Sequence, residues 1–209
     1  GPFRTWPLEK MANVTVAAAR AHPNWSMGLK ISIDSASMFN KALEMIEAKH
    51  LFALRPEQVE VIVHPQSIVH SMVAYHDGSI LAQLGPSDMR VAIGYALNHP
   101  ERGHLPVERL DFAKLSRLDF EAPDEARFPA LRLARQAMEQ GGLSGAVLNA
   151  AKEVALEAFI AGRLPFLRMA EVVEKVKESM NTGSALDLAS ILEADTSARR
   201  NATEIIAKP

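Results

Sequence analysis

The sequence contains no cysteine, which excludes disulfide bonds, thiolate metal sites and a cysteine nucleophile. Any metal ion would therefore be held by carboxylate, imidazole or carbonyl groups. Long apolar runs are also missing, and none approaches the roughly 20 residues that span a bilayer. Neither sign of charge dominates, because 23 basic and 25 acidic side chains give a net charge of -2 without a basic stripe. This balance argues against nucleic acid or a membrane as the main partner.

The remaining composition is that of an ordinary globular protein, with 48% apolar and 23% charged residues. A length of 209 residues allows one large domain or two small ones. The first residue is Gly1 rather than methionine, which is explained either by a fragment of a longer chain or by the remnant of a protease cleavage site. No signal peptide opens the sequence, so we expect a cytoplasmic protein.

The first half of the sequence predicts helices and a small sheet. Prolines and scattered aromatic residues indicate mostly loop over residues 1–33, with a short helix at 11–21. Asp34 and Ser35 are good helix N-caps, and apolar residues recur at helical spacing after them as far as Leu51. The dipeptide Asp77-Gly78 favours a hairpin turn between two β-like runs. The other expected elements are a strand at 59–63, hairpin strands at 68–75 and 79–84, and a helix at 88–98.

The second half predicts helices alone. A polar stretch at 99–124, broken by prolines and a glycine, is the expected linker. Beyond it, apolar residues at three-and-four spacing predict a small antiparallel bundle. Its helices are expected at 128–140, 144–161, 167–180 and 185–207. The predicted fold class is α+β, with a first domain at 1–98 containing a small mixed or antiparallel sheet and a four-helix bundle-like domain at 125–209.

The densest polar group lies at the start of the predicted helix that runs to residue 51. A helix N-terminus offers unpaired N–H groups and a partial positive charge, which suit a phosphate. Ser35, Asn40 and Lys41 would add hydroxyl, amide and ammonium donors, and Glu44 shares a face with Asn40. Glu44 would then be a metal ligand or a base. The alternative is that Asp34 or Ser35 only caps the helix and that Lys41 and Glu44 form a weak surface pair.

A second unusual segment is His22-Pro23-Asn24-Trp25-Ser26-Met27-Gly28, which has little periodicity. Large side chains on such a loop either pack locally or cover a ligand. Trp25 is therefore interpreted either as a lid over a site or as an anchor in the core. The seven histidines show no metal-binding spacing and are expected to be structural. Met89 follows Ser87 and Asp88, which are expected to cap another helix, and a methionine at this position by itself favours a core role.

Several long motifs together resemble 1-deoxy-D-xylulose 5-phosphate reductoisomerase, and the resemblance runs over essentially all 209 residues. The motifs are Gly1-Pro2-Phe3-Arg4, the His22–Gly28 loop, Lys30-Ile31-Ser32-Ile33-Asp34-Ser35, Asn40-Lys41 with Glu44, His64-Pro65-Gln66-Ser67, His70-Ser71-Met72-Val73, Asp77-Gly78-Ser79 and Leu148-Asn149-Ala150-Ala151. Because Gly1-Pro2-Phe3 falls inside a longer motif of the family, we prefer the explanation that the chain is a fragment over the explanation that Gly1 is a cleavage remnant.

The resemblance implies an NADPH-dependent enzyme of the non-mevalonate isoprenoid route. Such an enzyme rearranges a phosphorylated ketose and reduces the product to 2-C-methyl-D-erythritol 4-phosphate, assisted by Mg²⁺ or Mn²⁺. It also implies a homodimer and an N-terminal NADPH-binding domain, for which this chain has no Gly-x-Gly-x-x-Gly motif. The family's Asp-Ser-Glu segment, which supplies further metal carboxylates, is absent too. We therefore expect residues 1–98 to be the C-terminal part of the catalytic domain, and the chain alone to be inactive.

The resemblance also implies roles for individual residues. Ser35, Asn40 and Lys41 would bind the substrate phosphate, and Glu44 would be one metal ligand. The further implied residues are His22 and Trp25 in the catalytic pocket, with Met27 and Met89 near the cofactor.

Two departures from the family pattern are visible. Met89 follows Gly85-Pro86-Ser87-Asp88 where the family has Gly-x-Pro-Asp, and Lys152 stands where the family has asparagine. The second change is expected to be harmless on a bundle helix. Two other functions stay open: a non-catalytic phosphate-binding or scaffold module that keeps this fold, and a helical interaction protein without phosphate affinity.

Overall fold

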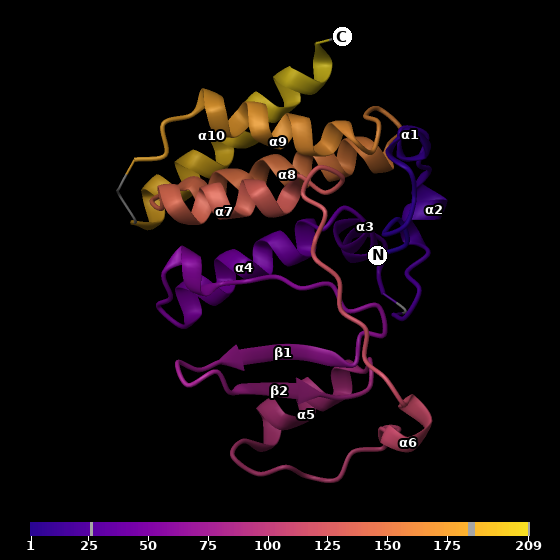
Figure 1. Cartoon of the computed structure of the whole chain (residues 1–209). Coiled ribbons are helices and arrows are strands. Elements are labelled where there is room, and N and C mark those ends of the chain that lie inside the picture. Colours follow the sequence, from indigo (N-terminus) through magenta and orange to yellow (C-terminus); the bar gives the residue numbers. More distant parts are fainter. Residues whose placement is uncertain (26, 184–186, 209) are drawn as a thin grey trace. The chain divides into compact units, whose positions relative to one another are not determined.

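The computed structural model describes residues 1–25, 27–183 and 187–208, which form two compact units (Figure 1). The first unit comprises Gly1–Pro23, Met27–Glu60 and Asp124–Pro209, and the second comprises Asn24–Ser26 and Val61–Pro123. Helices predominate, and the second unit contains a two-stranded antiparallel sheet. The predicted α+β fold class is confirmed.

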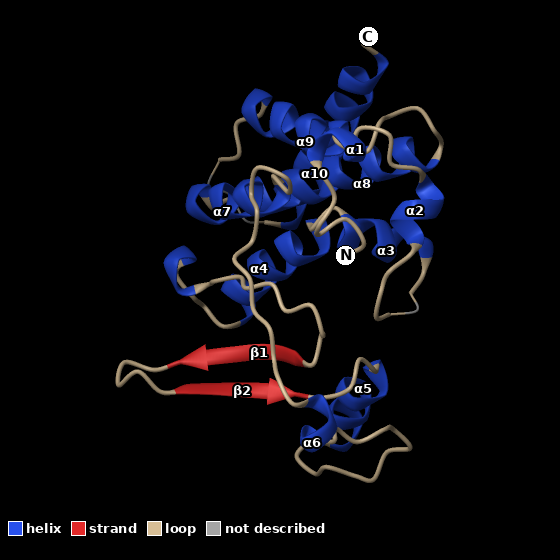
Figure 2. Cartoon of the chain, turned by 45° about the vertical axis from the view of Figure 1, so that its right-hand side comes forward, coloured by secondary structure: helices blue, strands red, loops and turns tan. Residues whose placement is uncertain are grey.

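The first unit is built from helices, coloured blue in Figure 2. Helix α8 packs against α7, α9 and α10, while α4 packs against α7 and α3 packs against α2, α4 and α8. The helices of this unit are α1 (Leu8–Met11), α2 (Val16–Arg20), α3 (Leu29–Ala36), α4 (Phe39–Leu51), the short 3-10 helix η1 (Pro56–Gln58), α7 (Ala130–Gln140), α8 (Ser144–Ile160), α9 (Arg168–Ser179) and α10 (Leu188–Ala207).

Small and aliphatic residues explain why α8 takes the central place. Val147, Leu148, Ala151 and Ala155 are all fully buried on it, so the helix is apolar over much of its circumference. Helix α10 carries buried alanines at every fourth position, at residues 194, 198 and 202. A face of this kind lets two helix backbones approach closely. The four predicted C-terminal helices are thus confirmed within the described residues, whereas positions 185 and 186 of the expected fourth helix lie outside them.

The second unit contains β1 (Val69–Ala74), β2 (Ile80–Leu84), α5 (Met89–Asn98) and α6 (Phe112–Leu115). The two strands are antiparallel neighbours, with Val73 opposite Leu81. Gly78 adopts a φ of +87°, which an L side chain adopts only with strain, and the Ser79 N–H donates to Asp77 Oδ1 at 2.8 Å. The hairpin predicted from the Asp77-Gly78 dipeptide is confirmed. Helix α5 matches the expected helix, and α6 is a short helix inside the expected linker.

The strand expected at 59–63 is wrong. Among the described residues, Val63 alone of this segment forms a β-bridge, through two backbone hydrogen bonds of 2.9 Å with Glu121. The neighbouring contacts are made by side chains: Gln66 exchanges hydrogen bonds with Asp119, and His64 Nδ1 lies 2.7 Å from the Asp119 carbonyl. A β-prone segment without a partner strand along its length stays irregular.

The predicted N-cap at Asp34 or Ser35 is also wrong. Both residues lie in the last turn of α3, which begins after Gly28 and ends where Met38 enters the left-handed region at φ +66°. Helix α4 then starts separately. The loop expected over residues 1–33 is interrupted by α1, α2 and the start of α3, and the single helix expected at 11–21 is replaced by the two short helices.

The compact units group residues differently from the expected ranges 1–98 and 125–209, because most of residues 1–60 belong with the C-terminal helices. Helices α4 and α7 pack together within that unit, so the grouping follows their shared core. Among the helices of the described residues, none is long and apolar enough to cross a membrane.

Candidate functional site

The polar cluster singled out in the sequence lies at the first turns of α4. Asn40 Nδ2 donates to Glu44 Oε1 at 2.6 Å, and Lys41 Nζ pairs with Glu44 Oε2. About two fifths of the Lys41 and Glu44 side chains is exposed, at 42% and 44%. The structure thus brings these three side chains together at a position open to solvent.

The backbone around this cluster favours an anion. Met38, the N-cap residue of α4, provides no side-chain hydrogen bond to the first turn of the helix. The N–H groups of such a turn, together with the helix dipole, attract negative charge. Ser35 lies one short turn earlier, where its carbonyl accepts from the Met38 N–H at 3.3 Å. Ser35, Asn40 and Lys41 therefore flank one corner, between the end of α3 and the start of α4.

Glu44 occupies both donors that were expected to bind phosphate. An exposed pair of this kind contributes at most about 1 kcal/mol, so a phosphate dianion can compete for Lys41 and Asn40. A cation bound to Glu44 would favour the same exchange, since it would neutralise the carboxylate. The cluster is thus chemically suited to an anion and a cation side by side.

Glu44 is a single carboxylate, and a hard divalent ion takes six or more oxygen ligands, several of them from water. Within the described parts of the chain, no group of three acidic or histidine side chains is close enough to hold a metal ion. The residues present therefore fit one ligand of a metal site rather than a complete one.

The segment around Trp25 belongs to the second unit. Trp25 Nε1 donates to Ser67 Oγ at 3.0 Å, and Asn24 Nδ2 donates to the Pro65 carbonyl at 2.8 Å. Ser67 itself has a φ of +54°, and its carbonyl accepts from Ser87 Oγ at 3.0 Å. Trp25 is half-buried in this position. The sequence interpretation missed Ser67 as its partner, although the motif containing this residue was noted.

The remaining expected site residues are distributed over both units. His22 and Met27 belong to the first unit, and Met89 belongs to the second. Burial lowers the pKa of His22, which favours its neutral form near pH 7. Met27 is partly buried, and its carbonyl lies 3.5 Å from Ser32 Oγ. Met89 is the first residue of α5 and is exposed, while Asp88 caps the helix by accepting from the Arg90 N–H.

Lys152 stands where the family has asparagine, a change that was expected to be harmless on a bundle helix. It is buried in α8, and its Nζ donates to Asp34 Oδ2 at 3.0 Å. Burial raises the pKa of the Asp34 carboxyl, whereas the Lys152 charge opposes that change. A lysine within a run of small apolar residues was the available signal, because a buried charge needs a partner.

Two protein-family models match the chain. The model described as "DXP reductoisomerase C-terminal domain" matches residues 84–201, and the model described as "1-deoxy-D-xylulose 5-phosphate reductoisomerase C-terminal domain" matches residues 1–52. Among curated relatives, the reductoisomerase of Rhizobium meliloti is 70% identical over 207 residues, which are 99% of this chain and 53% of that protein. The Agrobacterium fabrum reductoisomerase is 69% identical over 208 residues, covering 99% and 52%.

Solved reductoisomerase structures are also similar to this chain. The Zymomonas mobilis reductoisomerase in complex with NADPH is 48% identical with a TM-score of 0.92, covering 100% of this chain and 54% of that one. A reductoisomerase in complex with NADPH, fosmidomycin and magnesium is 44% identical with a TM-score of 0.91, covering 99% and 53%. The chain spans about half the length of the curated relatives it matches. The resemblance seen in the sequence is confirmed, and the chain belongs to the DXP reductoisomerase C-terminal domain family, whose model matches residues 84–201.

Proposed function

We propose that this chain is the C-terminal part of an NADPH-dependent enzyme that converts 1-deoxy-D-xylulose 5-phosphate to 2-C-methyl-D-erythritol 4-phosphate. The observation that carries the proposal is the corner between α3 and α4, where amide and ammonium donors meet one carboxylate. Family membership supports a phosphorylated ketose as the ligand of this corner. The NADPH-binding domain would come from an N-terminal half of the kind that the relatives contain.

In this proposal Ser35, Asn40 and Lys41 hold the substrate phosphate. Their contribution is positioning, because the phosphate is remote from the carbon atoms that react. The first turn of α4 adds backbone N–H groups and the positive end of its dipole. Lys41 supplies the full positive charge of the set.

Glu44 would provide one ligand to Mg²⁺ or Mn²⁺, beside carboxylates of the N-terminal half. A divalent ion bound there supplies a Lewis acid that stabilises negative charge developing on substrate oxygens. Glu44 would also couple phosphate binding to metal binding, because a Glu44 carboxylate held by the metal would leave Asn40 and Lys41 free to bind the phosphate.

His22 and Trp25 would line the reacting end of the pocket, with Met27 and Met89 near the nicotinamide of NADPH. Trp25 would cover the bound substrate and exclude water during the reduction. A neutral His22, favoured by its lowered pKa, would be able to donate one hydrogen bond and accept another.

We further propose a cytoplasmic homodimer, formed through the hairpin. Supporting this assignment, Val73, Ile80 and Leu81 on the two strands are more than half exposed. Exposed apolar strands of this kind are typical of surfaces that another chain covers.

The proposal is tested by NADPH oxidation in a full-length enzyme, that is, this chain joined to the N-terminal half of its Rhizobium meliloti relative. Oxidation should require 1-deoxy-D-xylulose 5-phosphate and a divalent metal, and it should stop on addition of a chelator. Lys41→Ala should raise the KM for the substrate far more than it lowers kcat. A folded enzyme that binds phosphate without oxidising NADPH would instead support the non-catalytic phosphate-binding module.

A further inference from the structure

The buried ion pair between Lys152 and Asp34 connects the central helix α8 to the turn that carries Ser35. The two side chains are only 6% and 9% exposed, and 118 positions separate the residues in the sequence. Asp34 Oδ1 is buried and has no hydrogen-bond partner among the described residues. Lys152 therefore provides the direct link between this carboxylate and α8.

A pair so deeply buried is weak evidence for stability, because removing two charges from water costs about as much as their attraction returns. In some proteins a buried pair serves instead to fix one geometry. Here the geometry concerns the end of α3. The Ser37 hydroxyl donates to the carbonyls of Ile33 and Asp34, and the next residue, Met38, is held in the left-handed region. A strained non-glycine residue of this kind costs about 1–3 kcal/mol and persists only where its surroundings fix it.

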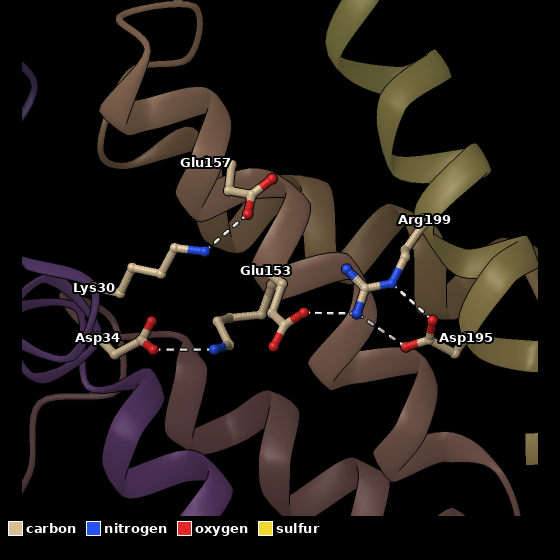
Figure 3. Close-up of polar contacts among 7 residues, drawn as sticks. Lys30, Asp34, Glu153, Glu157, Asp195 and Arg199 are labelled. Atoms are coloured by element: carbon tan, nitrogen blue, oxygen red, sulfur yellow. Dashed lines mark hydrogen bonds and ion pairs between the residues drawn. The ribbon is translucent and has the colours of Figure 1, made fainter. Parts of the chain in front are cut away.

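Figure 3 shows the wider set of charges around α8. Lys30 and Asp34 stand four residues apart on α3, and Lys30 Nζ donates to Glu157 on α8 at 2.9 Å. On another side of α8, Arg199 of α10 joins Glu153 and Asp195. The same two helices, α3 and α8, are thus linked by one exposed pair and one buried pair. The exposed side chains of Lys30 and Glu157, at 64% and 59%, are screened by water and impose little geometry.

We propose that Lys152 is a positioning residue of the phosphate site, acting through Asp34 to set where Ser35 and the first turn of α4 meet the substrate phosphate. The inference rests on the proposed function. Asp34 is the neighbour of Ser35 in the chain, so a shift of the α3 turn on α8 carries Ser35 with it. Asn40 and Lys41 follow within two turns. A small displacement of these groups should weaken binding of the substrate phosphate, since their contribution is to position the substrate.

The test uses three variants of the full-length enzyme. Lys152→Met removes the buried cation and leaves Asp34 uncompensated. The double variant Asp34→Asn with Lys152→Met removes both charges, which restores stability without restoring the link. Lys30→Met is the matched control, because it breaks the exposed pair between the same two helices. Thermal unfolding, the KM values for substrate and NADPH, and the inhibition constant of inorganic phosphate are measured for each.

Lys152→Met should raise the inhibition constant of phosphate and the KM for the substrate in parallel, by about tenfold or more, with the KM for NADPH unchanged. The double variant should regain melting temperature while its phosphate inhibition constant stays raised. Lys30→Met should bind phosphate as the parent does. If Lys152→Met does not fold, the phosphate inhibition constant of the double variant alone tests the proposal.

Two results would overturn the inference. One is a folded Lys152→Met enzyme with the phosphate inhibition constant of the parent. The other is a double variant that regains phosphate binding together with its stability, because the pair would then be purely structural. A parent enzyme that neither turns over the substrate nor binds phosphate contradicts the proposed function instead, so the two failures are distinguishable.

Discussion

Replacing Glu44 by glutamine should strengthen metal-free phosphate binding and weaken the response to metal. The carboxylate pairs with Lys41 and accepts a hydrogen bond from Asn40, so it competes directly with an incoming phosphate. The side chains of the Glu44–Lys41 pair are about two fifths exposed, which limits its contribution to about 1 kcal/mol or less. Removing the competing charge should therefore tighten phosphate binding by up to about fivefold without metal.

The assay is calorimetric titration of the full-length enzyme with inorganic phosphate, with chelator present and then with Mg²⁺. Glu47→Gln is the matched control, because it removes the same charge from an exposed position of the same helix. In the parent, Mg²⁺ should tighten phosphate binding, since the metal would draw Glu44 away from Lys41. In Glu44→Gln this gain should be smaller, and the Mg²⁺ concentration needed for activity should rise. Equal phosphate affinity of Glu44→Gln and Glu47→Gln without metal would show that Glu44 does not compete with phosphate.

Three further predictions concern the chain alone, the Trp25 segment and the core. The isolated 209-residue chain should show no metal-dependent NADPH oxidation, because Glu44 supplies one metal ligand; substrate-dependent oxidation abolished by chelator would contradict this. Trp25 should change its fluorescence emission and acrylamide quenching when a phosphonate substrate mimic binds, as measured in a full-length Trp6→Phe enzyme that lacks other tryptophans. Its hydrogen bond to Ser67 Oγ contributes only about 0.5–1.5 kcal/mol, so closure over a ligand can break it, and identical spectra would favour the anchor interpretation. Leu148→Ala should lower the free energy of unfolding by about 2–5 kcal/mol, measured by urea titration, because Leu148 is fully buried on α8; a loss below about 1 kcal/mol would contradict its place in the core.

Local signals in the sequence were sufficient to predict the hairpin and the C-terminal helices. The turn at Asp77-Gly78 needs a positive φ, which glycine adopts without cost, and its flanking strands follow from that turn. The helices α7 to α10 follow from apolar residues that recur at helical spacing. In both cases the information lies within a few residues of the element that it predicts.

The errors occurred where distant residues decide the structure. Asp34 and Ser35 favour an N-cap locally, yet they close α3, because the break falls at Met38 and Asp34 pairs with a residue 118 positions away. The segment at 59–63 has β-prone residues, but only Val63 finds a partner, at Glu121. The residues around Lys152 indicate that a buried charge there needs a partner, but in neither case do the neighbouring residues identify that partner.

The candidate site was predicted in part by spacing. Asn40 and Glu44, four residues apart, do share a face and contact each other. The competition of Glu44 with phosphate was not predictable, because it depends on the side-chain conformations of Glu44, Asn40 and Lys41. The role of Lys152 was missed because an ion pair across two helices depends on how those helices pack.

The most direct test is a crystal structure of the full-length enzyme with a phosphonate substrate mimic and Mg²⁺. We expect phosphonate oxygens within hydrogen-bond distance of Ser35 Oγ, Asn40 Nδ2 and Lys41 Nζ, with Glu44 turned onto the metal. A phosphonate bound elsewhere, with Glu44 still paired to Lys41, would contradict this expectation.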